Sequence, residues 1–304
     1  MAYYCGIDGG GTKTHCVIGD EKNIISEFIA SGSNYHITGL ENSKKNIEKA
    51  FNEALKKAKI SKKEIKFSVL GLSGADRDED IKKLTKTLYP IFGKNFKIFN
   101  DCWIALKNGI RDYYGIVAVC GTGGGYAGRT KDGKEFIYRN LDYITGNRGG
   151  GTEIAEKALH FAFRSEEGSY KKTALEEKIP ELFQVKNMAQ VLEKIFMKEI
   201  DKKILDKIPP LVFLLAEKND EVCIEILTEL GKTISEYLQG LINHLHFEGK
   251  IPTILSGSIF KTKNKTLIST IRNNLPSSSE IIIPDTPPVF GAYKLAIDHS
   301  IDFS

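Results

Sequence analysis

The chain has 304 residues, of which 41% are hydrophobic and 27% charged, a composition typical of a globular protein with room for two lobes. Its net charge of +4, from 43 basic and 39 acidic side chains, is weak and has no long run of one sign, which argues against a nucleic-acid partner. No apolar stretch approaches the roughly 20 residues that cross a bilayer, and the N-terminus lacks the features of a secretory signal. We therefore expect a cytoplasmic protein without a membrane partner.

The first part of the chain alternates strands and helices. Apolar and aromatic runs on both sides of a glycine loop predict a hairpin, and the helical spacing of apolar residues over 42–58 predicts the first helix. A proline at position 90 is expected to stop the second helix. The whole pattern predicts strands at 3–8, 14–20, 23–30, 66–72 and 96–100, and helices at 42–58, 77–89 and 101–108.

The pattern then begins again. Residues 116–120 predict a strand that leads into a second glycine loop, with strand-like residues up to Arg129. From 151 to 246 the chain is mostly helical. The expected elements after the loop are helices at 152–163, 188–200, 208–218 and 220–246, a strand at 251–255, a helix at 262–274, a strand at 280–283 and a last helix from about 288.

This repeated order predicts an α/β fold with two lobes. Each unit consists of a strand, a glycine loop and a strand, followed by helices and further strands. We expect the two lobes to face each other across a central cleft, the first over residues 1–117 and the larger second lobe, with a helical insertion, over 118–304. The last helix is expected to pack back on the first lobe.

The first loop, GIDGGGTKT at 6–14, is not a standard nucleotide-binding motif. A GxxxxGK[ST] loop fails because Thr12 precedes the lysine, and the later GxGxxG at 123–128 leads to a hairpin where a dinucleotide site needs a helix. What remains is a turn whose backbone amides can bind an anion, since glycines let phosphate oxygens come close. The plain alternative is an ordinary hairpin turn, which needs one or two glycines, not three.

The side chains of this loop fit the same interpretation. Asp8, at the end of the first strand, is placed to help hold Mg²⁺ through water. Lys13 adds a positive charge, and small hydroxyl groups flank it. The candidate nucleotide-binding residues of the loop are Asp8, Gly10, Gly11, Thr12, Lys13 and Thr14.

Five motifs occur in the order GIDGGGTKT, GLSGAD, FNDCWIAL, CGTGGG and SGSIF, followed by PPVFGAYKLA near the end. In this order they resemble the actin-like ATPase and sugar-kinase superfamily, and more narrowly its N-acetylglucosamine kinases and BadF/BadG-type ATPases. The resemblance covers nearly the whole chain. It implies two actin-like, ribonuclease H-like lobes that hold ATP, with Mg²⁺, between the first loop and the GTG loop, with the SGS turn beside the adenosine. The second-lobe residues implied in this site are Gly121, Thr122, Gly123, Gly257 and Ser258.

The resemblance also assigns the reacting groups. Asp101 follows a strand and opens a helix, so by position alone it is equally well a helix N-cap. The matching aspartate of the sugar kinases is the catalytic base that accepts the proton of the sugar hydroxyl. Asn34 and Ser73 match positions that line the sugar pocket, although Asn34 is also an ordinary turn residue, and Thr122 could serve either the γ-phosphate or the sugar. His36 is interpreted as a pocket wall or a loop residue.

One segment departs from the family pattern. Where the family has a GDEGS-like segment that touches the sugar, this chain has GNRGGG at 146–151. Gly146, Asn147 and Arg148 remain candidate substrate-binding residues, since an amide still hydrogen-bonds a hydroxyl. Arg148 is suited to attract an anion such as the lactyl carboxylate of N-acetylmuramic acid. Its plain alternative is a solvent-facing residue at a helix start.

These residues together favour an ATP-dependent amino-sugar kinase. The expected substrate is N-acetylglucosamine, with N-acetylmuramic acid and glucosamine as further candidates, and the resemblance implies transfer to the 6-hydroxyl and a homodimer. The alternative is an ATPase that activates a 2-hydroxyacyl-CoA dehydratase or a benzoyl-CoA reductase. Those activators hold an iron–sulfur cluster between subunits, whereas the five cysteines here are scattered and form no CxxC pair. Asp101 disfavours a non-catalytic regulator, and the lack of a Cys/His cluster disfavours the zinc-bearing sugar kinases.

Overall fold

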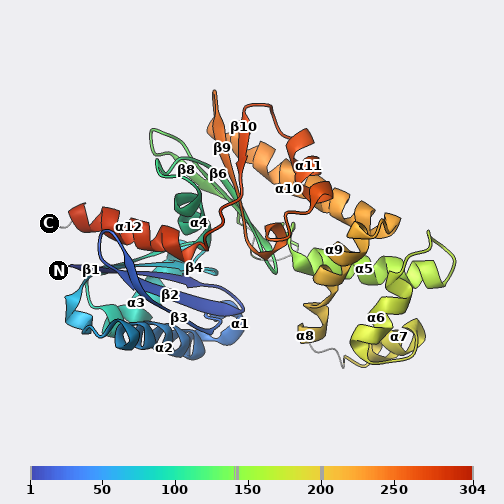
Figure 1. The fold of residues 1–304 in the computed structure, drawn as a ribbon, viewed down its shortest axis with the longest axis horizontal. Helices are drawn as coiled ribbons and strands as arrows, with labels where there is room; N and C mark the ends of the chain where they lie inside the picture. The colour runs from blue at the N-terminus through green and yellow to red at the C-terminus, as the bar shows by residue number, and fades with distance from the viewer. Residues whose placement is uncertain (1, 140, 142–143, 199–201, 303–304) are drawn as a thin grey trace.

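Two five-stranded sheets with the same strand order organise the chain (Figure 1). The computed structural model describes residues 2–139, 141, 144–198 and 202–302. The strand orders are β3-β2-β1-β4-β5 and β8-β7-β6-β9-β10. In each sheet a three-stranded antiparallel meander is extended by two strands parallel to its first strand. The repeat and the α/β fold class predicted from the two glycine-bracketed hairpins are therefore confirmed.

The first sheet and its helices follow the predicted order. Its elements are β1 (Tyr3–Gly9), β2 (Lys13–Gly19), β3 (Ile24–Ser31), α1 (Tyr35–Thr38), α2 (Leu40–Ala58), a 3₁₀ turn (Lys62–Glu64), β4 (Ile65–Leu72), α3 (Asp78–Phe92), β5 (Phe96–Phe99) and α4 (Asp101–Gly109).

The second sheet carries most of the helices. Its elements are β6 (Gly115–Cys120), β7 (Gly124–Arg129), β8 (Glu135–Ile137), α5 (Gly151–Glu166), α6 (Leu175–Phe183), α7 (Met188–Phe196), α8 (Lys202–Leu205), α9 (Ile208–Glu217), α10 (Glu221–Leu245), β9 (Ile251–Ser256), a 3₁₀ turn (Ser258–Phe260), α11 (Lys265–Asn273), β10 (Ser279–Ile282) and α12 (Val289–Asp302). No helix among these described residues is both long and apolar enough to cross a membrane.

Two helix predictions need correction. Helix α3 does not stop at Pro90 but continues to Phe92 and ends at Gly93, whose φ is +68°. Proline removes only one hydrogen bond near this end, and the two residues after it are buried in the core of the first lobe. The expected helix at 188–200 ends at Phe196, and positions 199–201 lie outside the described residues. Helix α6 was not predicted at all.

Helix α4 is wedged between the two sheets. Its apolar side chains Cys102, Trp103, Ala105 and Leu106 form one buried cluster with Val117, Ala127 and Ile254 of the second sheet. Its Ile104 turns the other way and packs with α12 and the first sheet. Helix α12 lies against the first sheet, as expected for the end of the chain (Figure 1). Both lobes therefore share one helix as a common wall.

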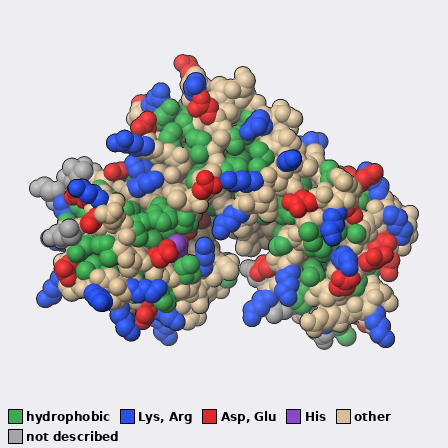
Figure 2. All heavy atoms as spheres, in the orientation of Figure 1, with side chains coloured by type: hydrophobic (Ala, Val, Ile, Leu, Met, Phe, Trp, Pro, Cys, Tyr) green, Lys and Arg blue, Asp and Glu red, His purple; other side chains and the backbone are tan. Residues whose placement is uncertain are grey.

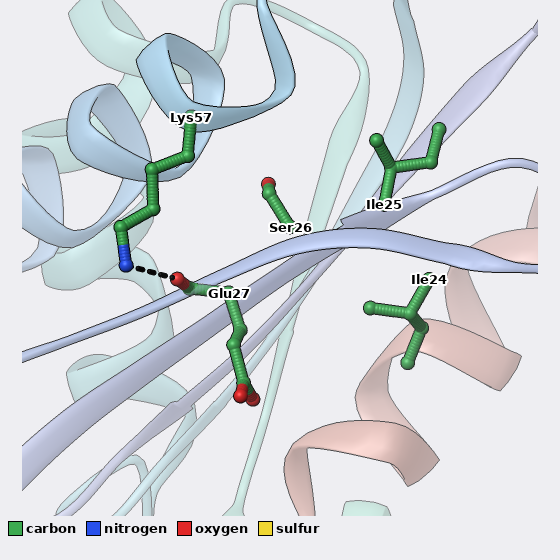
Figure 3. Close-up of a pocket in the computed structure, with 5 residues that line it drawn as sticks. All are labelled: Ile24, Ile25, Ser26, Glu27 and Lys57. Atoms are coloured by element: carbon green, nitrogen blue, oxygen red, sulfur yellow. Dashed lines mark hydrogen bonds between the residues drawn. The ribbon is translucent and has the colours of Figure 1, made fainter.

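The outer edge of the first sheet is protected. Strand β3 is an edge strand, and Lys57 of α2 donates a hydrogen bond from Nζ to the backbone carbonyl of Glu27, 3.1 Å away (Figure 3). A lysine at an edge strand hinders pairing with a strand of another molecule. The hollow drawn in Figure 3 lies at this edge, at the end of β3 away from the first glycine loop, since Lys13 pairs with Ser31.

The close approach of α12 and α4 depends on a glycine. A Cβ at Gly291 would lie 1.9 Å from the carbonyl oxygen of Ile104. We expect Gly291→Ala to lower the free energy of unfolding by about 2 kcal/mol in denaturant titrations, because the backbone of α4 must move. Lys294→Ala, at an exposed position of the same helix, should change it by less than about 0.5 kcal/mol. Equal stability of the two variants would contradict this contact.

Candidate active site

The first glycine loop is a tight hairpin tip with open space at one glycine. Gly10 donates a backbone hydrogen bond to the carbonyl of Lys13 at 2.9 Å. A Cβ at Gly9 would lie 2.4 Å from Ser33 Oγ, so packing alone excludes a side chain there. At Gly10 the nearest atom to such a Cβ is the Lys13 carbonyl oxygen, 3.6 Å away. Gly10 is thus the position at which the missing side chain leaves room for a ligand.

The predicted sugar-binding side chains meet beside this loop. Asn34 donates from Nδ2 to Ser73 Oγ at 3.2 Å. The backbone amides of Ser33 and Asn34 donate to the carbonyl of Gly10, and the amide of Ser73 donates to that of Gly9. The loop and the Asn34–Ser73 pair therefore form one hydrogen-bonded unit at the carboxyl ends of β1 and β4.

One loop residue lies elsewhere than expected. Thr14 is fully buried, and its hydroxyl donates to the carbonyl of Ser31 at 2.7 Å. It also lies 2.9 Å from Ser33 Oγ. Its hydroxyl hydrogen is therefore committed inside the protein, and no surface of Thr14 is accessible to a ligand. Thr12 and Lys13, at the tip, are exposed.

Asp101 is the first residue of α4, not its cap. The N-cap is Asn100, whose Oδ1 accepts from the amide of Cys102 at 2.9 Å. The carboxylate of Asp101 is therefore not needed to cap the helix. Burial raises its pKa to about 7, and the negative charges of Asp8 and Asp76 contribute further. A carboxyl group with this pKa can exchange a proton near neutral pH.

Asp8 shares this environment. It lies near the carboxyl end of β1, next to β4 in the same sheet. Burial raises its pKa to about 6, and the positive charge of Lys13 lowers it in part. Parallel strands of one sheet bring residues at their carboxyl ends together, which explains why residues 93 positions apart interact. Asp8 and Asp101 therefore form an acidic centre with too little positive charge nearby to balance it.

The second glycine loop is fastened to the start of α5. The amides of Gly151 and Thr152 donate to the carbonyls of Gly121 and Thr122 at 2.8 Å and 3.0 Å. Asn147 Oδ1 accepts from the amide of Gly124 at 2.9 Å. The predicted phosphate residues 121–123 and the atypical segment 146–151 therefore form a second unit.

Gly257 belongs to the second unit as well. Its φ is +105°, and a Cβ on it would lie 2.2 Å from the carbonyl oxygen of Cys120. Ser258, which follows it, is exposed. The two units belong to different sheets, and Figure 2 shows a deep notch between the part of the molecule with the first sheet and the part with the helices of the second.

Arg148 makes an ion pair in this structure. Its guanidinium donates to Glu153 Oε1 at 2.9 Å, and the other oxygen of Glu153 accepts from the amide of Gly149. Burial raises the pKa of Glu153, but these hydrogen bonds and the charge of Lys157 outweigh it and hold the pKa below its ordinary value. The side chain of Arg148 is 38% exposed. It therefore keeps a surface that a ligand can reach while it supports the segment.

Several supporting residues were not recognised in the sequence. Tyr237 donates to the carbonyl of Gly146 at 2.6 Å, and Tyr126, stacked on it, donates to that of Arg148. Such long-range contacts leave no local pattern. Asp76 lies in the GLSGAD motif, but the sequence around it indicates no role. It lies close to His36 and Asp80, although Asp80 already accepts hydrogen bonds from Arg77 and Tyr35.

Two sheets with the same strand order, each with a glycine loop, define the fold of actin-like ATPases and sugar kinases. The chain belongs to the BadF/BadG/BcrA/BcrD ATPase family, whose pattern matches residues 5–296. The family is one of ATPases, which implies ATP as a ligand of this protein. A structure from Chromobacterium violaceum has this fold, with a TM-score of 0.77 at 18% identity over 97% of this chain and 99% of that chain. A ROK family glucokinase from Streptomyces griseus, solved with glucose and AMPPNP, gives 0.59 at 14% identity over 98% and 100%.

Two curated relatives are kinases of amino sugars. The chain is 30% identical over 253 residues to an N-acetylmuramic acid/N-acetylglucosamine kinase of Clostridium acetobutylicum, covering 82% of each protein. It is 26% identical over 312 residues to an N-acetyl-D-glucosamine kinase of Dictyostelium discoideum, covering 97% of this chain and 98% of that protein.

The raised pKa of Asp101 has a consequence for stability. In the unfolded chain its pKa is near the ordinary 3.8, and in the folded protein it is about 7. Between these values only the unfolded state loses the proton, so the contribution of Asp101 to the free energy of unfolding falls as the pH rises from about 4 to about 7 and then levels off. We expect Asp101→Asn to unfold at a higher denaturant concentration than wild type at pH 8, with little difference at pH 4. An equal difference in denaturant midpoint between variant and wild type at both pH values would contradict the raised pKa of Asp101.

Proposed function

We propose that the protein is an ATP-dependent kinase that transfers the γ-phosphate to a hydroxyl of an amino sugar, N-acetylglucosamine first among them. The observation that carries this proposal is the Asp101 carboxyl group, which is not used as a helix cap and shares an acidic centre with Asp8. The relatives named for amino-sugar kinase activity support it. The resemblance favours the 6-hydroxyl as acceptor and a homodimer as the assembled form.

Each lobe supplies part of the proposed nucleotide site. Gly10 borders open space, Gly11 is exposed at the tip of the loop, and Lys13 offers a positive charge. Gly121, Thr122 and Gly123 face the phosphates from the second lobe, with Gly257 and Ser258 beside the adenosine. In the same proposal the first lobe ends at residue 117 and the second begins at residue 118.

Asp8 fits a magnesium ion. Mg²⁺ prefers carboxylate oxygens and keeps several waters, and the raised pKa of Asp8 reflects a desolvated carboxyl group whose charge Lys13 compensates only in part. A bound Mg²⁺ would neutralise charge on the phosphates. Asp8 would hold the ion, through water, at the mouth of the first sheet.

The sugar would lie against the first unit. Asn34 and Ser73, whose Nδ2 and Oγ atoms lie 3.2 Å apart, would bind sugar hydroxyls and orient the acceptor. Thr122 would close the site from the second lobe. Asp101 would accept the proton of the attacking hydroxyl, for which a pKa near 7 is well matched. Closure of the lobes would keep water from taking the phosphoryl group.

The burial of the thiols favours a kinase over an activator ATPase. All five cysteines are buried, so none is presented at a surface where two subunits could share an iron–sulfur cluster. Burial raises the pKa of Cys120 to about 12, which makes it a poor source of the thiolate that binds metal.

The decisive experiment is Asp101→Asn. We expect this variant to fold and bind ATP like wild type, but to lose sugar phosphorylation by about 10²–10⁴-fold, because proton acceptance is removed. A coupled assay over a panel of amino sugars, with ATP affinity measured separately, gives both quantities. Activity above a few per cent of wild type would remove Asp101 from the role of base.

The second experiment concerns N-acetylmuramic acid, which carries a carboxylate. If Arg148 binds that group, Arg148→Ala should lower kcat/KM for N-acetylmuramic acid at least about tenfold more than for N-acetylglucosamine, since a charge-assisted hydrogen bond is lost. Glu153→Gln is the matched control, because it disturbs the same segment but keeps the arginine, so both sugars should change alike. Equal losses for both sugars in Arg148→Ala would overturn the assignment.

A further inference from the structure

The cap of α4 is itself held by a second side chain. Asn100 is buried, with 6% of its surface exposed, and uses both ends of its amide. Its Oδ1 accepts from the amide of Cys102 at 2.9 Å, and its Nδ2 donates to Asp76 Oδ1 at 2.7 Å. The carboxylate of Asp76 can only accept, so it fixes which end of the Asn100 amide faces the helix.

This bond links the ends of two neighbouring strands. Asp76 follows β4, and Asn100 follows β5, its parallel neighbour in the sheet. Asp101 comes directly after Asn100, so the direction of its side chain depends on how the first turn of α4 is held. The backbone amide of Trp103 donates to the carbonyl of Asn100 at 3.1 Å, which completes this turn.

We propose that Asp76 is a positioning residue for phosphoryl transfer, acting through the amide of Asn100 to hold Asp101 in its catalytic direction. The inference rests on the proposed function of Asp101. Without Asp76 the Asn100 amide can rotate and lose the cap. A displacement of about 1 Å of a catalytic group can cost about 10²-fold in rate without any loss of substrate contacts.

A double-mutant cycle tests this coupling. Asp76→Ala should lower kcat about 30-fold or more, with the KM for ATP unchanged within about threefold. Asn100→Ser keeps a good N-cap but cannot reach Asp76, so it should retain most of the activity. In the Asn100→Ser background, Asp76→Ala should cost less than about threefold, because the link is already absent. Asp76→Asn, which keeps an accepting oxygen, should rescue most of kcat.

Trp103 gives a readout that does not depend on activity. It is the single tryptophan of the chain, lies in the first turn of α4 and is 8% exposed. Asp76→Ala should shift its fluorescence emission, and Asp76→Asn should not. Asn187→Ala is a matched control, since Asn187 caps α7, a helix of nine residues like α4, in the other lobe. This control should lose cap stability but keep kcat and the Trp103 emission.

These measurements distinguish an effect of Asp76 through Asn100 from an independent effect of Asp76. A cost of Asp76→Ala that is the same in both backgrounds would overturn the proposal, because Asp76 would then act independently of Asn100. Full kcat and unchanged emission in Asp76→Ala would also overturn it. Failure of wild type to phosphorylate any amino sugar would overturn the proposed function, while the emission of Trp103 would still decide whether Asp76 and Asn100 are coupled.

Discussion

The burial of α4 between the two sheets is the constraint on which the rest of the structure depends. This short helix fits only because its neighbours lack side chains at the contact points. A Cβ at Gly71 would lie 2.3 Å from Ile104 Cδ1, and one at Gly125 would lie 2.9 Å from Cys102 Sγ. Close packing holds the helix axis, and the axis in turn aims its N-terminus at the ends of β1 and β4. The candidate base is thus placed by apolar packing that extends into both lobes.

The negative charges near the N-terminus of α4 oppose folding. Asp8, Asp76 and Asp101 are carboxylates in one desolvated region, and burial is the main cause of the raised pKa of each. Groups of like charge are tolerated together where a cation or a reacting proton makes use of them. The hydrogen bond from Asn100 to Asp76 relieves part of the cost and orders the amide that caps α4. These carboxylates therefore lower the stability of the fold at the place where the reaction is expected.

The agreement between sequence and structure is uneven for physical reasons. Hairpins and long amphipathic helices such as α2 and α10 were predictable, because their apolar spacing repeats within a short window. The end of α3 was not, since buried packing beyond Pro90 outweighs one lost hydrogen bond. A hydroxyl in a loop motif such as that of Thr14 looks available in a sequence, whereas Thr14 lies in β2, where every residue after Lys13 is buried and its hydroxyl donates to the carbonyl of Ser31. Asn100 and Asp76 were visible in their motifs, but their bond joins residues 24 positions apart.

The sequence by itself determined the two α/β units, the glycine loops and the identity of the candidate base, because strand periodicity, glycine runs and ordered motifs are local properties. Only the tertiary structure decided which polar groups act on one another: Asn34 donates to Ser73, Arg148 pairs with Glu153, and the charge of Asp8 helps to raise the pKa of Asp101. It also decided that Asn100, not Asp101, caps α4. Such pairings depend on strand order and helix packing, which bring distant segments together and which no short stretch of sequence encodes.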